Sequence, residues 1–182
     1  MSGSAFPSKV TQVDLGTTAS PQRFPLGYEV TLPAPKQSGG SVTADAGSQT
    51  WIYIFNDDAA SLVQGNVVAR DASTVTYDGI KAAASTPSMR VLGVAQHTIA
   101  AGSYGFILRK GLGEVLAGTG TIDDDEGLCV DTTDAGTAME FGGIAEAQDG
   151  TSTEHGISGP FGWATEDAVA TALATCWINC QG

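Results

Sequence analysis

The chain has 182 residues, a length that suits one main domain with a substantial hydrophobic core. Hydrophobic residues make up 42% and charged residues only 15%, so Gly, Ser, Thr and uncharged amides must build much of the surface. The net charge of −12 repels phosphate backbones, and we therefore expect no direct contact with nucleic acid.

Residues 1–40 differ from the rest of the chain. Five of the seven prolines lie here, at positions 7, 21, 25, 33 and 35, among Ser, Thr and Gly. Such a segment cannot build its own core, so we expect an extended arm followed by a domain over 41–182. Its scattered apolar residues need burial, which an arm lying across the domain or across a neighbouring subunit would provide; a disordered tail is the alternative. The expected contact residues of the arm are Phe6, Val10, Val13, Leu15, Arg23, Phe24, Pro25, Leu26 and Tyr28.

From about Thr50 the pattern changes to short apolar runs, rich in Val, Ile and aromatic residues and closed by glycine or by polar turns. This pattern predicts an all-β fold, a compact antiparallel barrel or sandwich. Residues 165–174 carry helix-forming residues and leave open one short helix near the C-terminal end. The expected strands cover residues 50–55, 65–69, 73–77, 91–98, 104–109, 114–117, 127–131, 138–141 and 174–180.

Residues 91–111 give the clearest local prediction. They read as a strand, a turn at 100–102, and a second strand that ends at Gly111. A unit of the form apolar-Gly-apolar-Ala occurs at 92–95 and again at 161–164, each time followed by a polar interval and a strand. The repetition suggests a duplicated hairpin, with coincidence as the alternative.

Residues with catalytic potential are few. The two histidines, His97 and His155, have no second His or Cys at metal-ligand spacing, which argues against zinc. No Gly-x-Ser-x-Gly motif marks a nucleophile, and we expect a protein that is not an enzyme and binds no cofactor. The cluster 123–126 lacks the alternating ligand spacing of a calcium loop, so a solvated turn is the better interpretation, while Asp131 and Asp134 leave a weak metal site open.

Other motifs have structural interpretations. The glycines around 111–113 and 118–120 lack the lysine and the following helix of a phosphate-binding loop. Arg109 and Lys110 end a strand and suggest an exposed edge or an interface pair. The aromatic residues at strand spacing are more often core than a stacking surface for bases or sugars; they are Trp51, Tyr53, Phe55, Trp163 and Trp177.

The cysteines do not suggest a disulfide framework. There are three, and if Cys176 and Cys180 share a strand their Cα atoms are about 13 Å apart, too far for a bond. We find neither a signal-peptide pattern nor a run of about 20 apolar residues. The simplest expectation is a soluble protein with reduced thiols that is made in the cytoplasm.

Three sequence features follow one another along the chain in a distinctive order. The first is Arg23-Phe24-Pro25-Leu26-Gly27 in the arm. The second is the aromatic run at 51–55 followed by Gly-Asn-Val-Val-Ala at 65–69. The third is Val-Leu-Gly-Val-Ala-Gln at 91–96, then 101–108, then a Gly-rich stretch that leads to Gly-Leu-Cys-Val at 127–130. This order resembles the head decoration, or capsid cement, proteins of tailed bacteriophages, and the resemblance covers roughly residues 23–182. For the virion component that it implies, the host cytoplasm is the expected place of synthesis.

The resemblance implies a virion protein without enzymatic activity that binds the outer surface of the head. Its implied partner is the major capsid protein, and a homo-trimer that clamps neighbouring capsomers is the expected arrangement. An arm with apolar anchors could add a strand to a sheet edge, and symmetric repetition would strengthen attachment. The long acidic loop at 146–155 and the cysteines near the C-terminal end depart from the family pattern. The alternatives are another virion β-module (tail tube, fibre or receptor-binding) and a carbohydrate-binding domain that uses the tryptophans.

Overall fold

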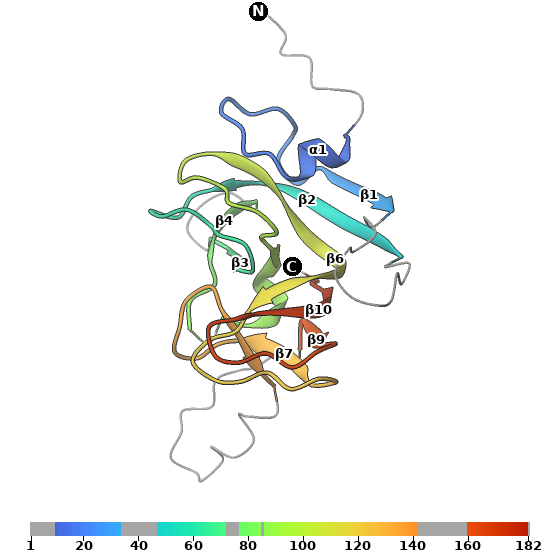
Figure 1. Cartoon of the computed structure of the whole chain (residues 1–182). Helices are drawn as coiled ribbons and strands as arrows, with labels where there is room; N and C mark the ends of the chain where they lie inside the picture. Colours follow the sequence, from blue (N-terminus) through green and yellow to red (C-terminus); the bar gives the residue numbers. More distant parts are fainter. Residues whose placement is uncertain (1–9, 34–46, 72–76, 85, 142–159, 182) are drawn as a thin grey trace, which may run out of the picture.

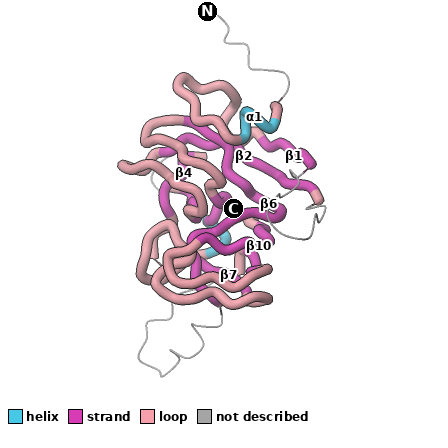
Figure 2. Tube along the Cα trace, viewed as in Figure 1, coloured by secondary structure: helices cyan, strands magenta, loops and turns pink. Residues whose placement is uncertain are grey.

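The computed structural model describes residues 10–33, 47–71, 77–84, 86–141 and 160–181. Strands and turns make up nearly all of this part (Figure 2), and 46% strand against 4% helix confirms the all-β class. No helix in these ranges is long and apolar enough to cross a membrane. The elements are α1 (Gln12–Leu15), β1 (Glu29–Pro33), β2 (Ser48–Asn56), β3 (Val67–Arg70), β4 (Asp78–Lys81), η1 (Ser88–Arg90), β5 (Val91–Val94), β6 (Tyr104–Leu116), β7 (Gly127–Val130), β8 (Ala138–Glu140), β9 (Gly162–Ala164) and β10 (Leu173–Asn179).

Five strands close a barrel, in the order β2-β4-β3-β5-β6, because β6 also pairs with β2. We call this the first barrel. The pairs are antiparallel except β2 with β4, which run parallel. Apolar side chains from β2, β3, β5 and β6, with Leu62, Ala95 and Ile99 from the loops, fill its interior. This cluster consists of Ile52, Ile54, Leu62, Val68, Leu92, Ala95, Ile99 and Ile107.

Strand β6 runs on past the barrel (Figure 1). The prediction that this strand ends at Gly111 is wrong, because 104–109 and 114–116 belong to one element that spans thirteen residues, with Ala117 just beyond its end. Its pairing with β2 shifts by one residue between Thr50 and Trp51, which marks a bulge in β6. Gly111 follows the bulge with a φ of +114°, and a Cβ there would lie 2.8 Å from the Ser48 carbonyl oxygen. Glycine therefore permits the bend instead of ending the strand.

Beyond the bend, β6 pairs with β10, and the sheet continues as β10-β9-β7-β8. A single parallel bridge, Ala117 to Ala138, brings β8 back to the end of β6. We call these five strands the second ring. Its interior is apolar, and the buried side chains that line it include Val115, Ile122, Leu128, Ala164, Ala174 and Cys176.

The first barrel and the second ring have the same pairing pattern. In the first, β3 pairs with β4 and β5, and β5 with β6; in the second, β7 pairs with β8 and β9, and β9 with β10. Isolated bridges also occupy equivalent places: Leu62, before β3, pairs with Ile99, between β5 and β6, and Ile122, before β7, pairs with Ala168, between β9 and β10. The repeated apolar-Gly-apolar-Ala units lie on the equivalent strands β5 and β9. The structure therefore supports duplication over coincidence, and the duplicated unit is larger than a hairpin.

Residues 10–33 pack on the first barrel, where they cover β2 and β6 (Figure 1). Val10, Leu15 and Phe24 belong to the same buried cluster as Trp51 and Tyr53 of β2. Strand β1 pairs with β2 and forms one edge of the ten-stranded sheet. Residues 10–33 of the predicted arm thus lie across the domain, which is one of the two expected arrangements, and β1 joins its sheet; residues 1–9 and 34–40 lie outside the described ranges.

One further prediction needs correction, and another falls where the structure does not test it. Residues 165–172 form turns and the bridge of Ala168, and 173–179 are the strand β10, so the short helix is α1 near the N-terminal end instead. The strand expected at 73–77 falls almost wholly outside the described residues, and β4 begins just after it. Strands β1, β4 and β9 were not predicted.

Candidate interaction surface

The nine predicted contact residues of the arm differ in their burial. Phe6 lies outside the described residues. Val10, Leu15 and Phe24 are buried in the chain's own core, and Leu26 packs against it half-buried. For these four residues the domain itself supplies the burial, so their side chains are not available as contacts to a neighbouring subunit. The remaining residues are exposed: Val13, Arg23, Pro25 and Tyr28.

Phe24 is the main anchor of the segment. Its ring meets Tyr53 edge-on at 5.2 Å and Phe106 at 5.3 Å between centroids, and it stacks on Tyr28 at 5.8 Å. The side chain is only 2% exposed. Aromatic contacts of this geometry add to the burial of apolar area, so Phe24 fixes the segment on the outer face of β2 and β6.

Backbone hydrogen bonds hold the same segment at two further points. Ala19 and Tyr104 exchange both of their backbone bonds, at 2.8 and 2.9 Å. The Gly27 N–H donates to the Tyr53 carbonyl, and the Arg23 N–H donates to the Tyr53 hydroxyl at 3.1 Å. Burial raises the pKa of that hydroxyl above its usual value, so it stays protonated at neutral pH.

An ion pair ties α1 to the loop that follows it. The Arg23 guanidinium lies 3.0 Å from the Asp14 carboxylate, which also accepts hydrogen bonds from the Thr11 N–H and hydroxyl. Burial would raise the pKa of Asp14, but the bonds from Thr11 and the charge of Arg23 outweigh it and hold the pKa below its usual 3.8. The carboxylate is therefore ionised at neutral pH, and the pair orients Arg23 at the surface.

The open edge of β1 lies next to this segment. Exposure alternates along the strand, and its side away from β2 has no strand partner among the described residues. The Tyr53 N–H donates to the Tyr28 carbonyl, so by antiparallel alternation Glu29 and Thr31 direct their backbone groups away from β2. We call β1 together with Val13, Arg23, Pro25 and Tyr28 the N-terminal surface. It can accept a further strand through backbone hydrogen bonds.

The residues with catalytic or metal-binding potential have structural roles where they are described. The His97 ring nitrogens lie 3.1 and 3.2 Å from the carbonyl oxygens of Thr98 and Phe106, and burial lowers its pKa. His155 lies outside the described residues. Burial raises the pKa of all three thiols, Cys129, Cys176 and Cys180, to about 12, which leaves them protonated and poorly nucleophilic.

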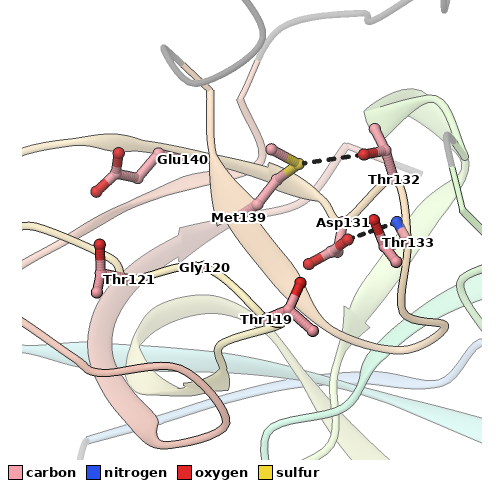
Figure 3. Close-up of a pocket in the computed structure, with 8 residues that line it drawn as sticks. All are labelled: Thr119, Gly120, Thr121, Asp131, Thr132, Thr133, Met139 and Glu140. Carbon is pink, nitrogen blue, oxygen red and sulfur yellow. Dashed lines mark hydrogen bonds between the residues drawn. The ribbon is translucent and has the colours of Figure 1, made fainter.

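A shallow hollow of about 320 Å³ lies beside Asp131 (Figure 3). The Asp131 carboxylate accepts the N–H groups of Thr133 at 2.6 Å and Asp134 at 3.2 Å, so it holds the turn that follows β7. In the acidic cluster, the Asp123 and Asp124 N–H groups are bound by other carboxylates, as in a turn. No group of three His, Cys, Asp or Glu side chains in the described ranges is placed to hold a metal ion.

One exposed feature was assigned wrongly from the sequence. Trp163, predicted as core, is 45% exposed and stacks on Trp177 with the ring centroids 5.9 Å apart. Trp51 and Tyr53 are buried as expected. Alternation in a three-residue strand such as β9 is too short to show which face is covered.

No protein-family model matches the chain, and no curated protein matches its sequence. Among solved structures, the chain is similar to the N base of head fiber gp8.5 in bacteriophage phi29, with a TM-score of 0.46 and 18% sequence identity. The match covers 71% of this chain and 94% of that chain. Similarity at this level assigns neither a family nor a partner to the chain.

Proposed function

We propose that the protein is a structural component of a tailed-phage virion that binds the outer surface of the head and stabilises it by clamping neighbouring capsomers. In this proposal it has no enzymatic activity and needs no cofactor. Its partner is the major capsid protein, and it acts as a homo-trimer once it is bound to the assembled head. The contact with the capsid is the N-terminal surface.

The open edge of β1 beside a firmly anchored segment carries the proposal. Phe24 and the bonds of Ala19 and Gly27 fix this segment on the barrel, so a partner strand that pairs with β1 would be held by the domain. A preformed edge needs little ordering on binding, which favours attachment at many equivalent sites. The sequence features that resemble decoration proteins lie on this segment and on β2, β3, β5, β6 and β7.

The acidic composition supports an exterior position. Twenty acidic residues against eight basic ones keep a protein of low charge density soluble, and they do not favour a place beside packaged nucleic acid. The second candidate is a fibre or other tail module, and the elongated arrangement of the first barrel and the second ring supports it (Figure 1). The two candidates differ in where on the particle the protein lies.

Binding to heads tests the proposal. Purified heads that lack this protein, from the phage that encodes it, are mixed with the chain and sedimented, and the bound fraction is measured against concentration. A Thr31→Pro variant removes one N–H from the open edge of β1 while the strand stays compatible with an edge position. We expect at least about tenfold weaker binding, because the added strand loses a backbone bond and meets the proline ring.

The matched control is Thr31→Val, which keeps the backbone donor and removes only the hydroxyl that lies 2.9 Å from the Thr50 hydroxyl. It should bind heads like the unmodified protein. Failure of the unmodified chain to bind heads would contradict the proposal. Electron microscopy of virions with a C-terminal label separates the candidates, because label along the tail or on a fibre refutes the head-clamping role.

A further inference from the structure

The outer face of the second ring shows a strict alternation. In β6 after the bend, Gly113 and Val115 are buried, and in β10 Ala174, Cys176 and Ile178 are buried. The intervening side chains face outward and are half-buried or exposed. They are Leu112, Glu114 and Leu116 on β6, and Leu173, Thr175, Trp177 and Asn179 on β10.

Apolar side chains form one row across this face. Leu112 pairs with Trp177, and Trp177 pairs with Trp163 on β9, so the three side chains are direct cross-strand neighbours. Trp163 then pairs with Gly127, whose carbonyl oxygen accepts the N–H of Phe141. Trp163 is 45% and Phe141 38% exposed. We call Leu112, Trp177, Trp163 and Phe141 the aromatic row.

The first barrel has an equivalent row, and there it is covered. By the same pairings, Trp51 lies opposite Leu108, and Leu108 lies opposite Val94. These three side chains are 6%, 0% and 0% exposed, because the rest of the molecule packs over them. In a duplicated architecture, a terminal unit that leaves its packing face open is suited to contact another such unit. Another copy of this chain carries such a unit.

The charges beside the aromatic row are self-complementary. On one side lies Lys110, exposed and opposite Asn179; on the other side lies Glu114, opposite Thr175. The Glu166 carboxylate also lies on the acidic side, where it accepts the N–H and hydroxyl of Thr175 at 2.9 and 2.6 Å. No carboxylate among the described residues pairs with Lys110. Lys110 and Glu114 are about 13 Å apart along β6, with Leu112 midway.

We propose that the aromatic row is a two-fold interface between two copies of this chain. A two-fold axis along the row places two outer faces together with their strands reversed, so row meets row. Lys110 of each copy then lies over Glu114 of the other, so Lys110 gains a carboxylate partner, and Glu114, which accepts a hydrogen bond from Gln64 of its own copy, gains an opposite charge. Any other orientation of the axis within the face brings like charges together or leaves Lys110 unpaired.

The size of the face sets the expected strength of dimerisation. Its width is about four strand spacings and its length is about six residues along the strands, which gives about 400 Å² per copy. This area is about half of what one partner contributes to a standard stable interface. We therefore expect a reversible dimer with a dissociation constant of tens of micromolar, which forms on its own in solution and does not depend on the proposed capsid role.

Sedimentation equilibrium of the full chain from about 1 µM to about 1 mM tests the interface. The unmodified protein should pass from monomer to dimer over this range. Trp163→Ser should weaken dimerisation at least about tenfold, because a central indole is lost from each side. The control Met89→Ser, at a residue 66% exposed on η1, should leave it unchanged. Circular dichroism checks that each variant folds.

Reversing the charges of Lys110 and Glu114 gives a second readout. A folding defect would not produce the recovery that we expect for the double variant. Lys110→Glu and Glu114→Lys should each weaken the dimer about fivefold, and the double variant, which restores opposite charges across the axis, should recover most of the loss. A chain that stays monomeric throughout, or an oligomer unaffected by Trp163→Ser, would overturn the proposal. So would a double variant weaker than both single ones. The proposal would also be overturned by a chain that stays monomeric and binds a glycan through Trp163. The aromatic row would then be a carbohydrate-binding surface.

Discussion

Replacing Phe24 with alanine should lower the free energy of unfolding by about 3–5 kcal/mol, which is a large part of the stability of a domain of this size. The side chain is 2% exposed and packs between Tyr53 and Phe106, so its loss leaves a cavity under residues 10–33. The collapse of neighbouring groups is limited, because β2 and β6 are held in the closed barrel. Urea unfolding, followed by circular dichroism, measures the change.

Pro25→Ala is the control for that experiment. Pro25 is the next residue and is exposed, so its substitution should change the free energy of unfolding by about 0.5 kcal/mol or less. If Phe24→Ala also cost less than about 1 kcal/mol, residues 10–33 would not be part of the cooperative unit. The segment would then be the loosely attached arm that the sequence suggested.

Gly93→Ala and Gly162→Ala should each destabilise the protein by at least about 2 kcal/mol. A Cβ at Gly93 would lie 2.5 Å from the carbonyl oxygen of Leu108, and a Cβ at Gly162 would lie 2.5 Å from that of Trp177. Both oxygens are backbone atoms of paired strands, so neither contact is relieved by rotating a side chain. Thermal unfolding of the two variants measures the loss.

These two glycines occupy equivalent positions in the first barrel and the second ring, so their costs should be similar. Gly120→Ala is the control, because a Cβ there meets nothing within 4 Å. A large loss for one glycine and none for the other would contradict the structural equivalence of the two units. It would also weaken the argument that gives the aromatic row a partner of the same kind.

The strands of the first barrel were the most predictable part of the fold. The run at 50–55 combines aromatic and β-branched residues in a length that suits a buried strand, and β2 contains it. The run at 104–109 is the barrel half of β6. Strand β9 was missed because three residues carry too little alternation to be recognised, although the glycine at its start repeats the one in β5.

The candidate site was predictable only in part. The sequence singled out Arg23, Pro25 and Tyr28, which the structure places on the surface, but it grouped them with Phe24, which is buried. An isolated apolar residue among prolines shows that burial is needed, and it cannot show whether the chain's own barrel or a neighbour supplies it. The exposed position of Trp163 was missed for the converse reason, because strand spacing alone does not tell a covered face from an open one.

Amide hydrogen exchange on the isolated, unmodified chain tests most directly whether residues 10–33 form a fixed platform beside the open strand edge. The N–H groups of Ala19 and Gly27 donate to carbonyls of Tyr104 and Tyr53. Their protection should therefore lie within about tenfold of that of the β2 amides. If both amides exchanged at the rate of an unfolded peptide while the β2 amides stayed protected, residues 10–33 would not be a fixed platform, and the central claim would be contradicted.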